Sequence, residues 1–137
     1  SNLPENMQHP ENLRSGEIFD EVVDFLQRQS EYAGSRGVAP ERIIWDPGIG
    51  FGKSAEQNLE LIRRAGDLKK YGYKLLYGVS RKSFIGKLLN IPDPAKRIAG
   101  SVGVALQLLD CGVEAVRIHD YFETREAWKM FLLSRRR

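Results

Sequence analysis

Short apolar runs alternate with longer helical patterns along this chain, and that alternation constrains the fold more than any other feature. The apolar runs fall at 42–45, 74–79 and 115–118. A helical pattern precedes the first run, others separate the three, and one follows the last. Such alternation is typical of a parallel sheet, because a parallel connection needs a crossover that is usually helical. The sequence therefore predicts an α/β fold with three adjacent parallel strands.

Local signals place the ends of the predicted helices. The first covers 17–33 and stops at Gly34 and Gly37. Ser54 caps the second, and Gly72 ends it. The later helices are expected to begin at Ser80–Ser83, at about Ala95 and at Thr124. Gly100 and Gly103 are expected to allow close packing, and the polar stretch 3–15 indicates a loop.

The number of strands bounds the architecture. A complete (β/α)₈ barrel has eight strands and about 250 residues, whereas this chain has 137 residues. Each predicted strand ends in a polar or glycine-rich turn, which fits the active face of a barrel and also the crest of a doubly wound sheet. We interpret residues 1–137 as the C-terminal half of a TIM barrel, a fragment whose N-terminal half is absent.

Composition limits the class of partner. The chain is 42% hydrophobic, with a formal net charge of +3, and it contains no apolar run near 18 residues. Its charges alternate in sign outside the basic tail 135–137, so nucleic acid is not expected as a partner. The single Cys111 excludes an internal disulfide and is typical of a reducing cytoplasm. A modest positive field suits a small anionic substrate.

The first strand leads into the octapeptide DPGIGFGK at 46–53. Asp46 at a strand end is placed to accept paired N–H donors, and the glycines allow the backbone to approach a flat ligand. An Asp-Pro-Gly turn without a ligand is the alternative. The spacing leaves Phe51 open between a core residue and a wall against a planar ligand. Lys53 is either solvated or part of the site.

The second and third strand ends carry cations. Ser80–Ser83 lies where a strand becomes a helix, a point at which free N–H groups favour anions; a solvated helix cap is the alternative. Arg117 and His119 are two apart on a strand and share a face, whereas Asp120 points the other way or into the loop. A histidine satisfied within the core is the alternative for His119. An inward-facing arginine is costly without an anion.

These motifs together resemble dihydropteroate synthase. The matching segments are DPGIGFGK at 46–53, GVSRKSFIG at 78–86 and RIHD at 117–120. AKRIAGSVGVAL at 95–106 resembles the family's long helix after strand seven, and Pro4–Gln8 the loop after its fifth strand. The resemblance implies an enzyme of folate biosynthesis, a cytoplasmic transferase that joins a dihydropterin methyl diphosphate to p-aminobenzoate and releases pyrophosphate. It further implies a homodimer, a Mg²⁺ requirement and sensitivity to sulfonamides.

The resemblance also implies roles for individual residues. Those expected at the pterin are Asp46, through paired hydrogen bonds to the aminopyrimidine edge, Gly78, Lys82 and Arg117. Those expected at p-aminobenzoate are Phe51, Lys53, Arg81 and Ser83. Arg117 and His119 are expected to bind the diphosphate. The catalytic set is Asp46, Lys82, Arg117 and His119.

Several expectations follow from what the chain lacks relative to the family. The family's metal ligand and half of its pterin contacts lie on earlier strands, so the fragment is expected to hold no metal and to be inactive alone. The alternatives are a non-enzymatic truncated remnant and a pterin-binding methyltransferase barrel, which would not need the diphosphate residues. An open half barrel is also expected to leave its barrel-facing side chains uncovered, so that Ile44, Leu75, Tyr77 and Val116 cannot all stay dry in a monomer. The fragment is therefore expected to associate through that open face or to behave poorly as a monomer.

Overall fold

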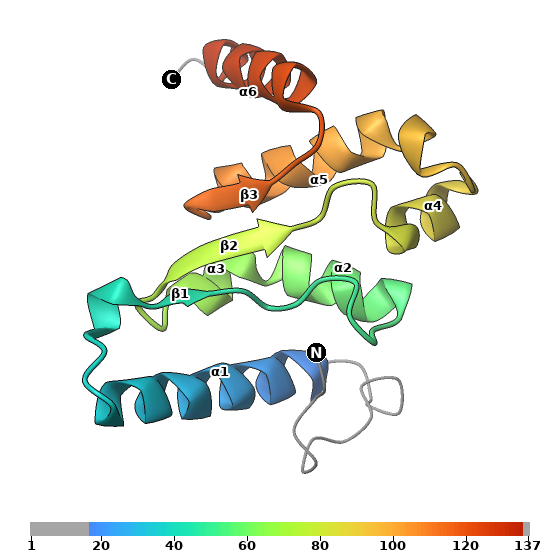
Figure 1. Ribbon diagram of the computed structural model, residues 1–137. Helices are drawn as coiled ribbons and strands as arrows, with labels where there is room; N and C mark the ends of the chain where they lie inside the picture. The colour runs from blue at the N-terminus through green and yellow to red at the C-terminus, as the bar shows by residue number, and fades with distance from the viewer. Residues whose placement is uncertain (1–16, 136–137) are drawn as a thin grey trace.

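The computed structural model describes residues 17–135, which form a sheet of three parallel strands in the order β1-β2-β3 (Figure 1). The strands are β1 (Ile44–Trp45), β2 (Lys74–Gly78) and β3 (Ala115–Arg117). Trp45 is in register with Leu75, and Gly78 with Arg117. The predicted parallel sheet is confirmed. The loop predicted at 3–15, including Pro4–Gln8, lies outside the described residues.

Helices precede, separate and follow the three strands along the chain (Figure 1). They are α1 (Glu17–Ser35), α2 (Ala55–Arg63), α3 (Ala65–Lys69), α4 (Ser83–Leu89), α5 (Ile98–Asp110) and α6 (Tyr121–Ser134), with 3₁₀ turns η2 (Pro40–Arg42) and η3 (Pro94–Lys96). Figure 1 shows α1 beside β1 and α6 beyond β3. Within residues 17–135 no helix is both long and apolar enough to cross a membrane.

Some helix boundaries follow the sequence signals and others do not. Ser54 caps α2 as predicted. Its Oγ accepts from the Gln57 N–H at 3.1 Å, and its own N–H donates to the Gln57 Oε1 at 2.9 Å. The predicted single helix from Ser54 to Gly72 is instead two, with a break at Arg64, whose guanidinium stacks over the Phe19 ring. The last helix begins at Tyr121, so the prediction of a start at Thr124 was wrong.

The two glycines of α5 behave differently. A Cβ on Gly100 would lie 2.6 Å from the Ile85 Cγ2, so this glycine does permit close packing against α4. A Cβ on Gly103 would meet no atom within 4 Å. The packing role predicted for Gly103 was therefore wrong.

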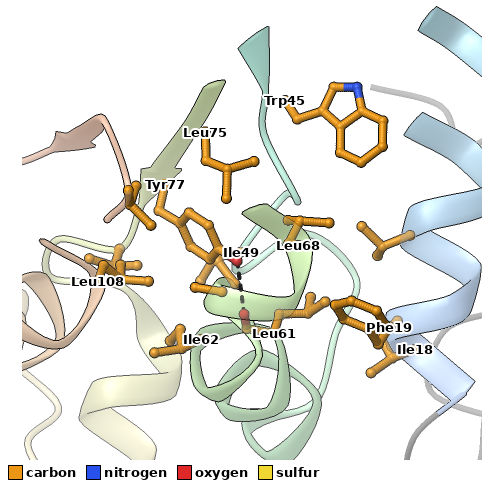
Figure 2. Close-up of a cluster of buried hydrophobic side chains, with 14 of the residues drawn as sticks. Ile18, Phe19, Trp45, Ile49, Leu61, Ile62, Leu68, Leu75, Tyr77 and Leu108 are labelled. Atoms are coloured by element: carbon orange, nitrogen blue, oxygen red, sulfur yellow. Dashed lines mark hydrogen bonds between the residues drawn. The ribbon is translucent and has the colours of Figure 1, made fainter. Parts of the chain in front are cut away.

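The core lies on one face of the sheet (Figure 2). Trp45, Leu75 and Tyr77 are almost completely buried among side chains of the surrounding helices. The Tyr77 hydroxyl donates to the Leu61 carbonyl at 2.8 Å, and the Trp45 Nε1–H donates to the Ser30 Oγ at 2.7 Å. These bonds satisfy polar groups that burial would otherwise penalise.

The opposite face of the sheet is open. Ile44 is 58% exposed and Leu76 is half-buried, whereas Leu75 and Tyr77 are fully buried. The expectation that Leu75 and Tyr77 belong to the open face was wrong, because strand alternation turns them toward the helices. The same alternation turns Asp46, which follows the buried Trp45, to the open face.

Candidate functional site

The carboxyl ends of the strands bring the predicted site residues to one edge of the sheet. Gly78 at the end of β2 pairs with Arg117 at the end of β3. A Cβ placed on Gly78 would lie 3.5 Å from the Lys82 Nζ and 3.7 Å from the Arg117 Nη1. Two cations therefore converge over a buried position that carries no side chain, which lets both head groups lie close to the backbone.

The glycine turn after β1 closes around its own carboxylate. The Asp46 Oδ1 accepts from the Gly48 N–H at 2.9 Å, so the Asp-Pro-Gly turn considered from the sequence does form. Gly50 has a φ of +87°, and a Cβ there would lie 2.9 Å from the Lys82 Cδ. The Gly50 N–H donates to the Oδ1 of the buried Asn58 at 2.9 Å. Sequence reasoning missed Asn58, which holds this turn from α2.

Lys53 and Phe51 lie on the same turn. The Lys53 Nζ donates to the Gly48 carbonyl at 2.7 Å and to the Phe51 carbonyl at 3.2 Å. Burial lowers the pKa of Lys53 to about 8, partly opposed by Asp46. Phe51 is 61% exposed, with the Lys82 Nζ 4.9 Å from its ring centroid. Phe51 is therefore not a core residue, and its role as a wall against a planar ligand stays a prediction.

Lys82 links the second strand end to the first. Its Nζ donates to the Ile49 carbonyl at 2.5 Å. Burial lowers the pKa of Lys82; Asp46 opposes that shift, and the like charge of Arg117 adds to it. Asp46 is thus the carboxylate whose negative charge acts on both Lys53 and Lys82.

Ser80 fixes His119. The Ser80 Oγ accepts from the His119 N–H at 3.0 Å and lies 2.9 Å from the His119 Nδ1. Ser80 is 7% exposed, whereas His119 is exposed. His119 and Arg117 both lie on exposed positions of the third strand end, as the two-residue spacing predicts, so the core-histidine alternative was wrong.

Arg81 lies in an ion pair. Its Nε and Nη2 donate to the two carboxylate oxygens of Asp120 at 3.1 and 2.6 Å. This fork holds the pKa of Asp120 below its usual range. Ser83 follows as the exposed first residue of α4. The geometry leaves the expected contact of Arg81 with p-aminobenzoate a prediction and gives its guanidinium a partner within the chain.

Arg97 is a buried cation that sequence reasoning missed. Its guanidinium donates to the carbonyls of Arg81, Ile91 and Pro92, each at 2.9 Å. It lies against Gly86, where a Cβ would approach the guanidinium to 2.4–2.5 Å. The sequence offered one signal, the glycine at position 86 in the middle of a helix, which suggests close packing. It did not show that Arg97 is the residue packed there.

A cleft of about 400 Å³ opens beside Ser83. The start of α2, the helix α4 and the segment 90–92 surround it, and Lys53, Asn58, Lys87 and Arg97 are among its lining residues. Among residues 17–135 no group of three or more His, Cys, Asp or Glu side chains is arranged to hold a metal ion. The described residues thus do not by themselves fit the Mg²⁺ that the resemblance implies.

Comparison with known proteins defines the class. The family model described as "Pterin binding enzyme" matches residues 1–119, and the chain belongs to this family. Within it, the chain is similar to dihydropteroate synthases. The enzyme of that name from Synechocystis is 46% identical over 116 residues, which are 84% of this chain and 40% of the relative.

Solved structures agree with the sequence match. A dihydropteroate synthase from Coxiella burnetii in complex with pteroic acid has a TM-score of 0.87 at 31% identity, over 98% of this chain and 50% of that one. The Thermus thermophilus enzyme in complex with 4-aminobenzoate has a TM-score of 0.80 at 40% identity, over 88% of this chain and 48% of that one. The chain spans about half the length of the proteins it matches, and its fold is part of a TIM barrel.

Proposed function

We propose that this chain supplies the C-terminal half of a dihydropteroate synthase site. The reaction is the condensation of a dihydropterin methyl diphosphate with p-aminobenzoate to dihydropteroate and pyrophosphate. The convergence of Lys82 and Arg117 over Gly78, with the charge of Asp46 acting on Lys82, carries the proposal. It supplies one anion for the pterin and cations for the leaving group at a single sheet edge.

The proposed chemistry breaks the bond between the pterin methylene carbon and the diphosphate oxygen. Arg117 and His119 donate to the diphosphate oxygens as negative charge grows there, which stabilises the transition state more than the ground state. Asp46 accepts from the aminopyrimidine N–H groups and offsets positive charge on the pterin. The arylamine nitrogen forms the new bond to the methylene carbon and then loses a proton to solvent.

The acceptor side of the proposed site lies at the turn after β2. Lys82 donates to the pterin carbonyl, and the exposed Phe51 ring is a wall beside the arylamine. The Ser83 hydroxyl at the mouth of the cleft receives the p-aminobenzoate carboxylate. Lys53, whose ammonium binds two carbonyls of the glycine turn, shapes the rim.

The remaining parts of the proposal concern groups outside the described residues. Mg²⁺, the other half of the pterin cradle and a cytoplasmic homodimer come from the resemblance. The proposed steps use protein side chains and solvent alone. Because the relatives are about twice as long as this chain, we propose that catalysis needs residues beyond these 137.

The test is the incorporation of labelled p-aminobenzoate into dihydropteroate. It is measured with the 137-residue chain and with the longest natural polypeptide that contains it. Asp46→Asn and Arg117→Ala should each lower kcat/KM of the active form roughly 30- to 1000-fold. This corresponds to a loss of about 2–4 kcal/mol of transition-state stabilisation. Asp24→Asn and Arg63→Ala, at exposed positions of α1 and α2, are the controls.

Three results would count against the proposal. Full activity in Asp46→Asn or Arg117→Ala removes that residue from the site. Absence of condensation in every natural form favours a non-enzymatic remnant. Methyl transfer without dependence on a pterin diphosphate favours a methyltransferase barrel.

A further inference from the structure

The three residues 80–82 each hold a different part of the site edge. Ser80 binds His119 at the end of β3, and Lys82 binds the Ile49 carbonyl in the turn after β1. Arg81, between them, binds Asp120 through its side chain. One short turn therefore contacts both neighbouring strand ends.

Arg81 is held in an unfavourable backbone conformation from three directions. Its φ is +57°, which a residue with a Cβ seldom adopts. Its N–H donates to the Ser101 Oγ at 2.7 Å, and its carbonyl accepts from Arg97 at 2.9 Å. With the guanidinium fixed on Asp120, backbone and side chain are both constrained by elements distant in sequence.

Asp120 connects this constraint to the diphosphate side. It is 8% exposed, precedes α6 and directly follows His119. Its carbonyl accepts from the Thr124 Oγ1 at 2.8 Å, which anchors it to the first turn of the helix. The ion pair therefore joins the Arg81 guanidinium to the residue next to His119.

We propose that Arg81 is a positioning residue that acts through Asp120. It locks the turn bearing Lys82 and Ser83 to the turn bearing Arg117 and His119, so that the acceptor and leaving-group parts of the proposed site keep one relative orientation. This inference rests on the proposed function. The guanidinium edge formed by Nε and Nη2, which would grip a substrate carboxylate, is already engaged by Asp120.

The first arm of the test is structural and needs no substrate. NMR spectra of the 137-residue chain are compared for wild type, Arg81→Lys and Asp120→Asn, with Arg63→Lys as a control at an exposed ion pair. Both site variants keep side-chain size nearly constant. We expect the His119 ring signals and the Lys82 and Ser83 amides to shift in both site variants and not in the control. Unchanged His119 signals would overturn the coupling.

The second arm separates positioning from direct contact. Inorganic pyrophosphate binding is measured for Arg81→Lys, His119→Ala and the double variant. We expect Arg81→Lys to weaken binding roughly tenfold when His119 is present and to add little in the His119→Ala background. An equal loss in both backgrounds would show that Arg81 touches the anion itself and would overturn the proposal.

The two arms distinguish the failures. If the wild-type chain binds no pyrophosphate, the proposed diphosphate site fails, and the NMR arm still decides whether Arg81 couples the two turns. If pyrophosphate binds and Arg81→Lys weakens binding equally with and without His119, the diphosphate site is supported and the positioning role of Arg81 is refuted.

Discussion

Gly86 offers the sharpest test of how the turn at 80–82 is supported. Gly86→Ala in α4 would place a Cβ 2.4–2.5 Å from three atoms of the Arg97 guanidinium. The end of a long, flexible side chain such as arginine normally moves away from a new Cβ at little cost in free energy. Arg97 is 9% exposed and binds three carbonyls at 2.9 Å, so moving it breaks bonds that a buried cation needs.

The magnitude follows from those bonds. A hydrogen bond to a charged group contributes about 1.5–3 kcal/mol, and we expect displacement to break one or two of the three. Replacing a mid-helix glycine with alanine by itself raises the free energy of unfolding by about 1 kcal/mol. We therefore expect Gly86→Ala to lower the free energy of unfolding by about 0.5–5 kcal/mol.

Urea unfolding followed by circular dichroism measures this, with Gly103→Ala as the matched control. Gly103 is also helical, and its Cβ would meet no atom within 4 Å. The control should be neutral or up to about 1 kcal/mol more stable. Equal stability of the two variants would refute the role assigned to Arg97.

Three further outcomes are expected. Tyr77→Phe removes the buried bond to the Leu61 carbonyl and should cost about 1–3 kcal/mol in urea unfolding; an unchanged midpoint contradicts this. The pKa of Lys53 is lowered from 10.5 to about 8, so between these values the unfolded chain binds more protons and stability should rise with pH; Lys53→Met should lose that rise, and parallel pH profiles would contradict it. The open sheet face, with Ile44 58% exposed, should drive association seen by sedimentation velocity at micromolar concentration, and a stable compact monomer would contradict it.

The sequence predicted the parts of the fold that local rules determine. Strand and helix order, the Ser54 cap and the shared face of Arg117 and His119 follow from periodicity and capping. The face of Leu75 and Tyr77 was misjudged, because a short apolar strand does not show by itself which side the helices cover.

The supporting residues of the site could not be predicted in the same way. Ser80 meets His119 across 39 positions, and Arg81 meets Asp120 across 39. Arg97 binds main-chain carbonyls, which carry no side-chain signal in the sequence. Such contacts depend on how distant segments are brought together, and only the assembled fold specifies them.

A crystal structure of this chain, or of a longer natural polypeptide that contains it, with pteroic acid would show whether the ends of β1 and β2 bind the pterin and the arylamine. We expect the pterin edge on Asp46, its carbonyl near Lys82, the aryl ring beside Phe51 and the carboxylate at Ser83. Pteroic acid bound away from the ends of β1 and β2, with Asp46 and Ser83 untouched, would contradict it.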